Sequence, residues 1–415
     1  MANNIILTPS TYAKGVAMNL GGYLAVCQNM TPQYSKYFAK EGAKVGAFID
    51  QKKPQRFQST TGLLYQPQPL QHQSVRITAD QVTGVHFEWD GVEKTLSIED
   101  AQENYFKPAA IALAHDINSK AAKFCAQNTF SVVGTVGVTP STVNTYLSAG
   151  DKVVALGLPP EEDLNCIVNR KFSSAYVVGQ STLFNPAGQI SEMVKNGGVV
   201  DNTLGYSWKR DQTIYTQTTG PYGGTPLVSG SGQASDGGNN TTGTLLTKGW
   251  TATPASRLVV GDRFNITGIN SVHPQTRQDT GILQDFVVMA PFSSDGSGNG
   301  TVTMAPAITP SGQFQNVTAS PLDGTAIVPF GAANTASPQA LLMHKNAFAF
   351  VSVPLATPES GKGVMKSAMA TDPDTGMTVA MVQFFDGVNR VEGTRFDMLS
   401  GFAVLYREMA CVIAG

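Results

Sequence analysis

The amino-acid sequence predicts an α+β fold that carries a separate all-β insert. A long amphipathic helix is predicted over 108–126, whereas strand-like alternation precedes it and follows it. Helical and strand-like segments mix without the regular β-α-β rhythm of a doubly wound sheet. Residues 221–331 contain only ten charged side chains in 111 positions, no cysteine and no helical periodicity. This stretch is therefore predicted to be a small β-barrel inserted into the α+β host.

Residues 1–45 are predicted to form an N-terminal arm. Thr8-Pro9 provides a helix start, and Tyr12, Val16 and Leu20 follow at a four-residue spacing. One short amphipathic helix cannot form a core alone, so it must pack on another part of the protein or on another subunit. Tyr12, Val16 and Leu20 are therefore candidate inter-subunit contacts.

Residues 46–100 are predicted to form an extended β loop. Val75, Ile77 and Ala79 alternate, as do residues 85–89, and Asp90-Gly91 is a two-residue hairpin signal. Between 52 and 72 the chain is polar and rich in Gln and Pro, with little to bury. We therefore expect this tract to leave the body of the subunit and contact a neighbour. The candidate contact residues are Lys52, Lys53 and Arg56.

The helix predicted over 108–126 has apolar residues on one face at three- and four-residue steps, and its candidate core consists of Leu113, Ile117 and Phe124. Further helices are predicted over 143–155 and 187–195, and a short buried strand over 166–168. After the insert, strand-like segments resume at 347–353, 377–384 and 402–406. Within the insert, the candidate core residues are Phe264, Ile266, Leu283 and Phe286.

Composition narrows the possible functions. Charged residues are 14% of the 415, where about 25% is usual, so we expect an unusually neutral surface. With 28 Lys and Arg against 30 Asp and Glu, the net charge of −2 argues against strong binding to nucleic acid, which depends on phosphate neutralisation. No secretory signal or membrane-spanning segment is predicted. The four scattered cysteines are predicted to be reduced and buried.

No catalytic, metal or cofactor motif stands out. The five histidines lack the short spacing of a metal-ligand pair, and His115 is interpreted as a polar helix-edge residue. Lys366-Ser367 lacks the two glycines of a phosphate loop, where Ser360 and Met365 stand instead. Glu161-Glu162 is interpreted as a solvated turn, although a glycosidase-type pair assembled from distant residues stays open. We therefore predict no enzyme activity, no metal and no cofactor.

Several sequence motifs, taken in order, resemble the major capsid proteins of tailed phages. The matching segments are 45–46, 52–57, 75–81, 99–114, 261–268, 272–276, 283–287, 344–348, 354–355, 376–379, 386 and 395–401. Together they resemble the Hong Kong 97-type fold, and more closely the podovirus coat-protein branch that carries an inserted β-barrel. Some members of the wider fold cross-link Lys to Asn, and no local pattern here identifies such a pair.

The resemblance implies a domain scheme. Its parts are 1–45 as N-terminal arm, 46–100 as extended loop region, 101–135 with 393–415 as peripheral domain containing the spine helix, 136–220 with 332–392 as axial domain, and 221–331 as inserted barrel. It also implies a subunit that self-assembles as pentamers and hexamers into an icosahedral shell around double-stranded DNA. Low charge with abundant Gly, Thr, Ser, Gln and Asn suits surfaces that bury polar area against several neighbours.

The resemblance further implies a scaffolding protein during assembly, a portal, and packaged DNA held non-specifically, with a decoration protein as a further candidate partner and no membrane. The expected location is the virion capsid, assembled in the host cytoplasm. Two alternatives come from other classes. One is a β-rich binding module on a virion or cell surface, with its ligand site in the insert. The other is a hydrolase.

Overall fold

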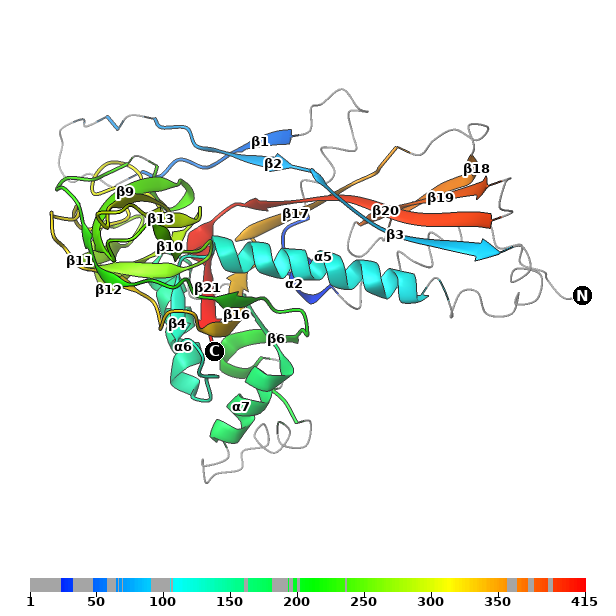
Figure 1. Ribbon diagram of the computed structural model, residues 1–415, viewed down its shortest axis with the longest axis horizontal. Helices are drawn as coiled ribbons and strands as arrows, with labels where there is room; N and C mark the ends of the chain where they lie inside the picture. The colour runs from blue at the N-terminus through cyan, green and yellow to red at the C-terminus, as the bar shows by residue number, and fades with distance from the viewer. Residues whose placement is uncertain are drawn as a thin grey trace, which may run out of the picture. The chain divides into compact units, whose positions relative to one another are not determined.

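The computed structural model describes residues 24–32, 48–57, 65, 67–68, 70–90, 105, 107–159, 163–180, 193, 197–199, 202–235, 237–356, 364–371, 377–386 and 391–415 (Figure 1). The chain divides into two compact units. The first unit comprises Met1–Gln51, Arg76–Ala121 and Ala349–Ala403, and the second comprises Lys52–Val75, Ala122–Phe348 and Val404–Gly415. Each unit is therefore assembled from three separate stretches of sequence.

The helices of the described residues are few and mostly short. They are α2 (Ala25–Gln28), α5 (Lys107–Asn128), α6 (Val143–Ala155) and α7 (Arg170–Gln180), with 3₁₀ turns η3 (Thr203–Gly205), η4 (Gly238–Asn240) and η5 (Arg407–Met409). The expected helix over 108–126 is α5, and the expected helix over 143–155 has the bounds of α6. Helix α7 was not predicted. The expected helix over 187–195 lies, except for residue 193, outside the described residues.

The first unit contains an antiparallel sheet that includes β17 (Phe348–Val353), β20 (Val391–Val404), β19 (Thr378–Asp386) and β18 (Val364–Thr371), in that order. The ten-residue strand β3 (Gln81–Asp90) pairs with β20 along its whole length, from Gln81 opposite Ser400 to Asp90 opposite Val391. Phe396 on β20 is 1% exposed and lies 6.1 Å from the ring of Phe87 on β3. Aromatic side chains of these two strands therefore pack against one another across the sheet.

Helix α5 has its apolar residues on one buried side. Leu113 and Ile117 are each 1% exposed, while Phe124 is half-buried and meets Phe348 edge-on at 6.2 Å. Asn118 is fully buried in the same helix, and its side-chain oxygen accepts a hydrogen bond from the Val26 backbone N–H at 3.0 Å. This bond fixes the 24–32 segment near the middle of α5 and gives the buried amide a partner.

The second unit contains a mixed sheet in the order β4 (Val132–Gly134), β21 (Ala410–Ala414), β16 (Ala336–His344), β5 (Leu164–Val168) and β6 (Tyr206–Arg210). The strand β16 is antiparallel to both β21 and β5, and its first residues also pair with β7 (Thr216–Thr218). The core between this sheet and helices α6 and α7 is aromatic, with Tyr146, Tyr176 and Trp208 at ring distances of 5.3–5.5 Å. Burial of this core ties the two helices to the sheet.

Residues 221–331 contain β-strands and one 3₁₀ turn. The main sheet runs in the order β15 (Ile327–Pro329), β11 (Arg263–Val272), β12 (Asp279–Val288), β14 (Gly300–Ala305), β9 (Gly243–Trp250) and β8 (Gly224–Val228). Its two outer strands meet, because Leu227 and Ala326 form an antiparallel bridge and Val228 N–H donates to Thr325 O at 2.9 Å. The sheet therefore closes on itself as a barrel. The short strands β10 (Ala255–Leu258) and β13 (Phe292–Ser294) pair beside it.

The barrel interior contains three of the four expected core residues. Phe264 and Phe286 stack at 5.6 Å between ring centres, and these two and Ile266 are at most 2% exposed. Leu283 was predicted wrongly, because it is 38% exposed. Residues three apart on a strand point to opposite faces, so Leu283 and Phe286 cannot both point inward from β12.

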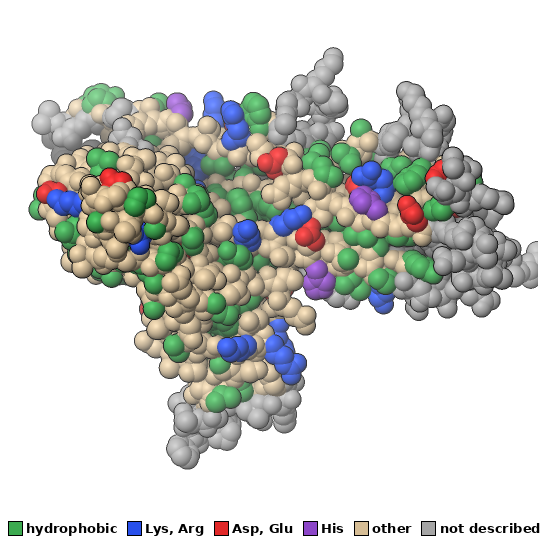
Figure 2. Space-filling model, viewed as in Figure 1, with side chains coloured by type: hydrophobic (Ala, Val, Ile, Leu, Met, Phe, Trp, Pro, Cys, Tyr) green, Lys and Arg blue, Asp and Glu red, His purple; other side chains and the backbone are tan. Residues whose placement is uncertain are grey.

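The chain's surface is poor in charge, and Figure 2 shows few Lys, Arg, Asp or Glu side chains on the face in view. Some of the charged side chains on neighbouring strands form local ion pairs. In the two-stranded ribbon of β1 (Phe48–Lys52) and β2 (Ser74–Thr78), Arg76 lies 2.9 Å from the Asp50 carboxylate and 4.0 Å from the centre of the Phe48 ring. Within the part of the chain that the structure describes, no helix is long and apolar enough to cross a membrane.

Candidate assembly site at the base of the extended segment

The extended segment, residues 52–75, leaves β1 and returns to β2, and its two ends are joined at the base. The Lys53 backbone N–H donates to Gln73 O at 2.8 Å, which continues the pairing of β1 with β2. The Gln55 amide nitrogen lies 3.1 Å from His72 Nδ1. The base is therefore a two-stranded structure with paired polar side chains, even though little in its sequence is apolar.

Lys53 packs against the C-terminal part of the same chain. Its ammonium donates to the Leu405 carbonyl oxygen and lies 4.6 Å from the centre of the Tyr406 ring. Burial lowers the pKa of Lys53 to about 8; the Glu408 carboxylate opposes this shift, and the positive charges of Arg56 and Arg407 add to it. The carbonyl and the ring favour the ammonium form, but the cost of removing it from water is larger.

Arg56 forms the central ion pair of the site. Its Nη2 donates to Glu408 Oε1 at 2.5 Å, and the side chains are 24% and 4% exposed. Arg407, next to Glu408 in η5, is also buried, and burial lowers its pKa to about 10. Among the described residues, neither Arg407 Nε nor Glu408 Oε2 has a hydrogen-bond partner. One buried carboxylate therefore lies among three cationic side chains.

The extended segment also contacts the barrel. Gln55 Oε1 accepts a hydrogen bond from Gln313 Nε2 at 3.0 Å, and Gln73 Nε2 donates to Gly237 O at 2.6 Å. Lys53 and Arg56 therefore pack against their own chain, and the expectation that this tract has little to bury is wrong for these two residues. Polar side chains pack here because each finds a charged, carbonyl or amide partner on another part of the chain.

The other expected contact residues are placed differently. Lys52, one residue before this cluster, has an exposed side chain. Tyr12, Val16 and Leu20 lie outside the described residues. The structure therefore brings Lys53 and Arg56 together with C-terminal residues, and leaves the arm as a prediction.

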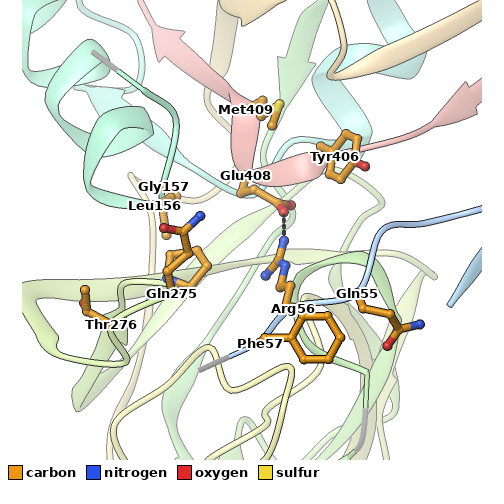
Figure 3. A pocket seen from close by; sticks show the side chains of 11 residues that line it. Gln55, Arg56, Phe57, Leu156, Gly157, Gln275, Thr276, Tyr406, Glu408 and Met409 are labelled. Carbon is orange, nitrogen blue, oxygen red and sulfur yellow. Dashed lines mark hydrogen bonds and ion pairs between the residues drawn. The ribbon is translucent and has the colours of Figure 1, made fainter. Parts of the chain in front are cut away.

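A cavity of about 450 Å³ lies beside the Arg56–Glu408 pair (Figure 3). In Figure 3 the Arg56 guanidinium and the Glu408 carboxylate point toward one another, joined by their hydrogen bond. The lining residues are Gln55, Arg56, Phe57, Leu156, Gly157, Pro274, Gln275, Thr276, Tyr406, Glu408 and Met409. The cavity therefore has a mixed apolar and polar lining, with one ion pair in its wall.

Arg263 forms a second polar cluster, where the barrel joins the α+β part of the second unit. Its guanidinium is buried and donates to Ala126 O at 2.5 Å and Thr129 O at 3.0 Å, at the C-terminal end of α5, and to Gln339 Oε1 at 3.2 Å on β16. Carbonyls in the last turn of a helix have no partner within the helix, and a cation there is favourable. Burial lowers the pKa of Arg263 to about 10.

Two aspartates complete this barrel junction. The Asp262 carboxylate accepts from the backbone N–H groups of Gly220 and Val259 at 3.0 and 2.9 Å, and burial still raises its pKa. Asp285 Oδ2 on β12 accepts from Lys152 Nζ of α6 at 2.7 Å and from the Val132 N–H at 3.2 Å. The motif 261–268 that carried the resemblance therefore marks the place where the insert is fixed to its host.

Sequence reasoning missed Tyr406, Glu408 and Lys152 as partners. Arg56 and Glu408 are separated by 352 positions, and no local pattern links two polar residues at that distance. The available signal was the polar run Tyr406-Arg407-Glu408 between two apolar strands, which is unusual for buried positions.

The described residues offer neither a metal-binding cluster nor an exposed cysteine. Within them, no group of three His, Cys, Asp or Glu side chains could hold a metal ion. None of the four cysteines forms a disulfide and all four are buried, and burial raises the pKa of the Cys411 thiol to about 12. Since the thiolate is the reactive form, a buried thiol of this kind is a packing residue.

Comparison with family models places the chain in a class of coat proteins. The family model described as "P22 coat protein - gene protein 5" matches residues 72–414, and this chain belongs to that family. It is a tailed-phage major capsid protein, a structural protein that assembles into an icosahedral shell. No curated protein matches the chain.

Solved phage structures show weaker likenesses. A structure from Mycobacterium phage Che8 is 11% identical, with a TM-score of 0.47, over 94% of this chain and 90% of that chain. The capsid structure of cyanophage P-SCSP1u is 13% identical, with a TM-score of 0.45, over 89% and 83%. The CUS-3 coat protein I-domain is 29% identical, with a TM-score of 0.19, and covers 25% of this chain and 94% of that one.

Proposed function

We propose that this major capsid protein adopts the Hong Kong 97-type arrangement with an inserted barrel. The domains would be the arm (1–45), the extended loop region (46–100), the peripheral domain with its spine helix (101–135 and 393–415), the axial domain (136–220 and 332–392) and the barrel (221–331). Support comes from the element order, with the 22-residue helix α5 after the β1–β2 ribbon and the strands of the barrel between β7 and β16.

In this proposal the subunit forms pentamers and hexamers around double-stranded DNA, with a scaffolding protein and a portal as partners and the host cytoplasm as the place of assembly. The extended segment provides overlap between neighbouring subunits, with Lys52 as an exposed contact. Its base holds it in a fixed direction, because both sides of the base are hydrogen-bonded to the barrel and the outgoing side is also bonded to the C-terminal residues 405–408. A fixed direction lowers the entropy lost when a neighbour is bound.

The observation that carries the proposal is the family match over 72–414. The test is negative-stain electron microscopy of the purified full-length protein, with sedimentation to follow the assembled fraction. We expect closed shells together with pentameric and hexameric rings. A protein that stays monomeric at every concentration, alone and with a scaffolding protein of its phage, would contradict the proposal. That result would favour the binding-module alternative.

The proposal includes no catalytic role. The support is that the family is one of structural coat proteins. A hydrolase would instead need an accessible acid–base pair with shifted pKa values beside a cavity.

A further inference from the structure

The cavity beside the Arg56–Glu408 pair is built from four separate stretches of one chain. They are 55–57 at the base of the extended segment, 156–157 after α6, 274–276 between β11 and β12, and 406–409 before β21. The end of α6 and the barrel form one continuous wall, because Pro274 Cγ lies only 2.9 Å from the place that a Cβ on Gly157 would take. At about 450 Å³, the cavity is within the range of small-molecule sites, about 300–1,000 Å³.

Arg56 is the charged group of the wall that an occupant can reach. Its side chain is 24% exposed, whereas that of Glu408 is 4% exposed. A guanidinium has five N–H donors, and among the described residues the hydrogen-bond acceptor of Arg56 is Glu408 Oε1 alone. Figure 3 shows that one of its nitrogens makes this bond. The Nε and Nη1 atoms have no acceptor and, unlike Glu408 Oε2, keep exposed surface. Arg56 can therefore donate further hydrogen bonds into the cavity.

The charges near the cavity favour an anion. Lys53, Arg56 and Arg407 are opposed by the single carboxylate of Glu408, and the two arginines add to the effect of burial in lowering the pKa of Lys53. A negative group beside Arg56 would reduce this repulsion, whereas an ammonium would increase it. A carboxylate carries one negative charge, which one guanidinium can balance. A phosphate group carries up to two and would lie near Glu408.

The apolar part of the wall requires a second feature of the occupant. Leu156 is 6% exposed, and Pro274 and Met409 are half-buried beside it in the lining. Thioether groups make favourable contacts with aromatic rings. An aromatic ring that carries a carboxylate would therefore meet both the apolar wall and the free donors of Arg56.

We propose that the cavity is a binding site for a small aromatic carboxylate. The carboxylate accepts hydrogen bonds from the Arg56 guanidinium, and the ring lies against Leu156, Pro274 and Met409. Since the four lining stretches come from different parts of the fold, an occupant holds these parts together, and binding stabilises the folded subunit. The site is complete within one chain, so the inference does not depend on the proposed assembly.

The direct test is a titration of the unassembled full-length protein, labelled at its Leu and Met methyl groups, with phenylacetate. We expect saturable shifts of the Leu156 and Met409 methyl resonances, with a Kd on the order of 1 mM for so small a ligand. The resonance of Met369, which is 47% exposed and does not line the cavity, should stay unchanged. Saturable shifts found only at other methyl groups would overturn the proposal, as would the absence of saturable shifts.

Two further probes separate the roles of charge and ring. Phenylacetamide has nearly the same shape without the charge, and we expect it to bind at least about tenfold more weakly, as the loss of a charged hydrogen bond implies. Acetate, which lacks the ring, should give no saturable shift below about 10 mM. Equal affinities for phenylacetate and phenylacetamide would overturn the assigned role of Arg56.

Variants then locate the preference for the carboxylate. Arg56→Met should bring the affinities for phenylacetate and phenylacetamide within about twofold of each other. The matched control is Arg76→Met, because Arg76 also pairs with an aspartate but is exposed and does not line the cavity. This control should keep the roughly tenfold preference. A tenfold preference that survives Arg56→Met would overturn the proposal.

A second variant leaves the ion pair intact, so that a folding defect of Arg56→Met does not decide the outcome. Gln275 is an exposed lining residue, and Gln275→Asp places a negative charge beside the cavity. It should weaken phenylacetate binding roughly threefold to tenfold and leave phenylacetamide unchanged. At ten times its Kd, phenylacetate should also raise the melting temperature of the wild type by about 1–2 °C. Unchanged phenylacetate affinity in Gln275→Asp would contradict binding in this cavity.

Discussion

Replacing Arg263 tests whether the barrel is held to its host by the end of α5. Arg263→Met keeps the length of the side chain and removes the guanidinium. Two buried carbonyl oxygens, those of Ala126 and Thr129, then lose a charged donor, as does the Gln339 side chain. Hydrogen bonds to charged groups contribute about 1.5–3 kcal/mol each.

The expected net loss is smaller than the sum of these bonds. Burial of the guanidinium is itself costly, as its lowered pKa shows, and the variant is relieved of that cost. We therefore expect Arg263→Met to reduce the free energy of unfolding by about 3 kcal/mol. The free energy of unfolding of Arg263→Lys should lie between those of Arg263→Met and the wild type. An ammonium retains the charge but cannot reproduce the planar guanidinium with its several donors.

The assay is urea denaturation of the unassembled subunit, combined with hydrogen exchange read by mass spectrometry. The matched control is Arg257→Met, because Arg257 is also buried but its acceptors, including Tyr222 O, Thr253 O and Ser294 Oγ, all lie within the barrel. We expect Arg263→Met to speed exchange in the last turn of α5, and Arg257→Met to speed it only in the barrel. A loss within about 0.5 kcal/mol for Arg263→Met, as exposed positions usually give, would refute the role of the guanidinium.

Three further predictions concern the helix, the extended segment and the insert. Ile117→Ala should reduce the free energy of unfolding by about 2–5 kcal/mol in denaturation, because Ile117 is 1% exposed, whereas exposed Lys123→Ala should change it by less than about 0.5 kcal/mol. The folded pKa of Lys53, about 8, lies below its ordinary 10.5, so the unfolded chain binds more protons between these values and stability should rise with pH in that window. Denaturation at pH 7 and pH 10 should show a gain of up to about 3 kcal/mol relative to Lys53→Met, and equal pH profiles would contradict the assigned burial. Residues 219–335 expressed alone should melt cooperatively and show dispersed β-type amide resonances. The reason is that the two ends of this stretch are joined, since Thr219 Oγ1 donates to Ala332 O at 2.6 Å and the Asn334 N–H donates to Gly220 O at 3.2 Å. A random-coil spectrum would contradict this prediction.

The parts of the fold that could be predicted are mostly those marked by the local periodicity of apolar residues. The expected helix over 143–155 has the bounds of α6, and the expected strand over 166–168 is the buried end of β5, because both patterns depend on neighbouring residues alone. Helix α7 was missed since its sequence is rich in aromatic and β-branched residues. Its start signal is Asn169, whose side-chain oxygen accepts from the Phe172 N–H at 2.9 Å.

The candidate assembly site was predictable only in part, because its residues come from distant parts of the sequence. Lys53 and Arg56 were singled out by their charge in a polar tract, but their partners come from residues 405–408 and are brought near by the fold. Leu283 failed because hydrophobicity was weighed without the strand's two-residue period. Asp262 and Arg263 belong to the motif 261–268 that the sequence shares with coat proteins, while their contacts with Gly220 and the end of α5 depend on the fold of the barrel.

The position of β16 in its sheet imposes an order on folding during translation. This strand is the partner of β5, β7 and β21, yet it follows the whole barrel in the sequence. While the ribosome synthesises the barrel, β5 lacks the antiparallel neighbour that will cover its edge, whereas the barrel strands need only one another. Contacts between residues close in sequence form sooner than distant ones. The barrel should therefore be complete before its host sheet, and the exposed edge of β5 should be the nascent chain's main opportunity for mispairing with another polypeptide.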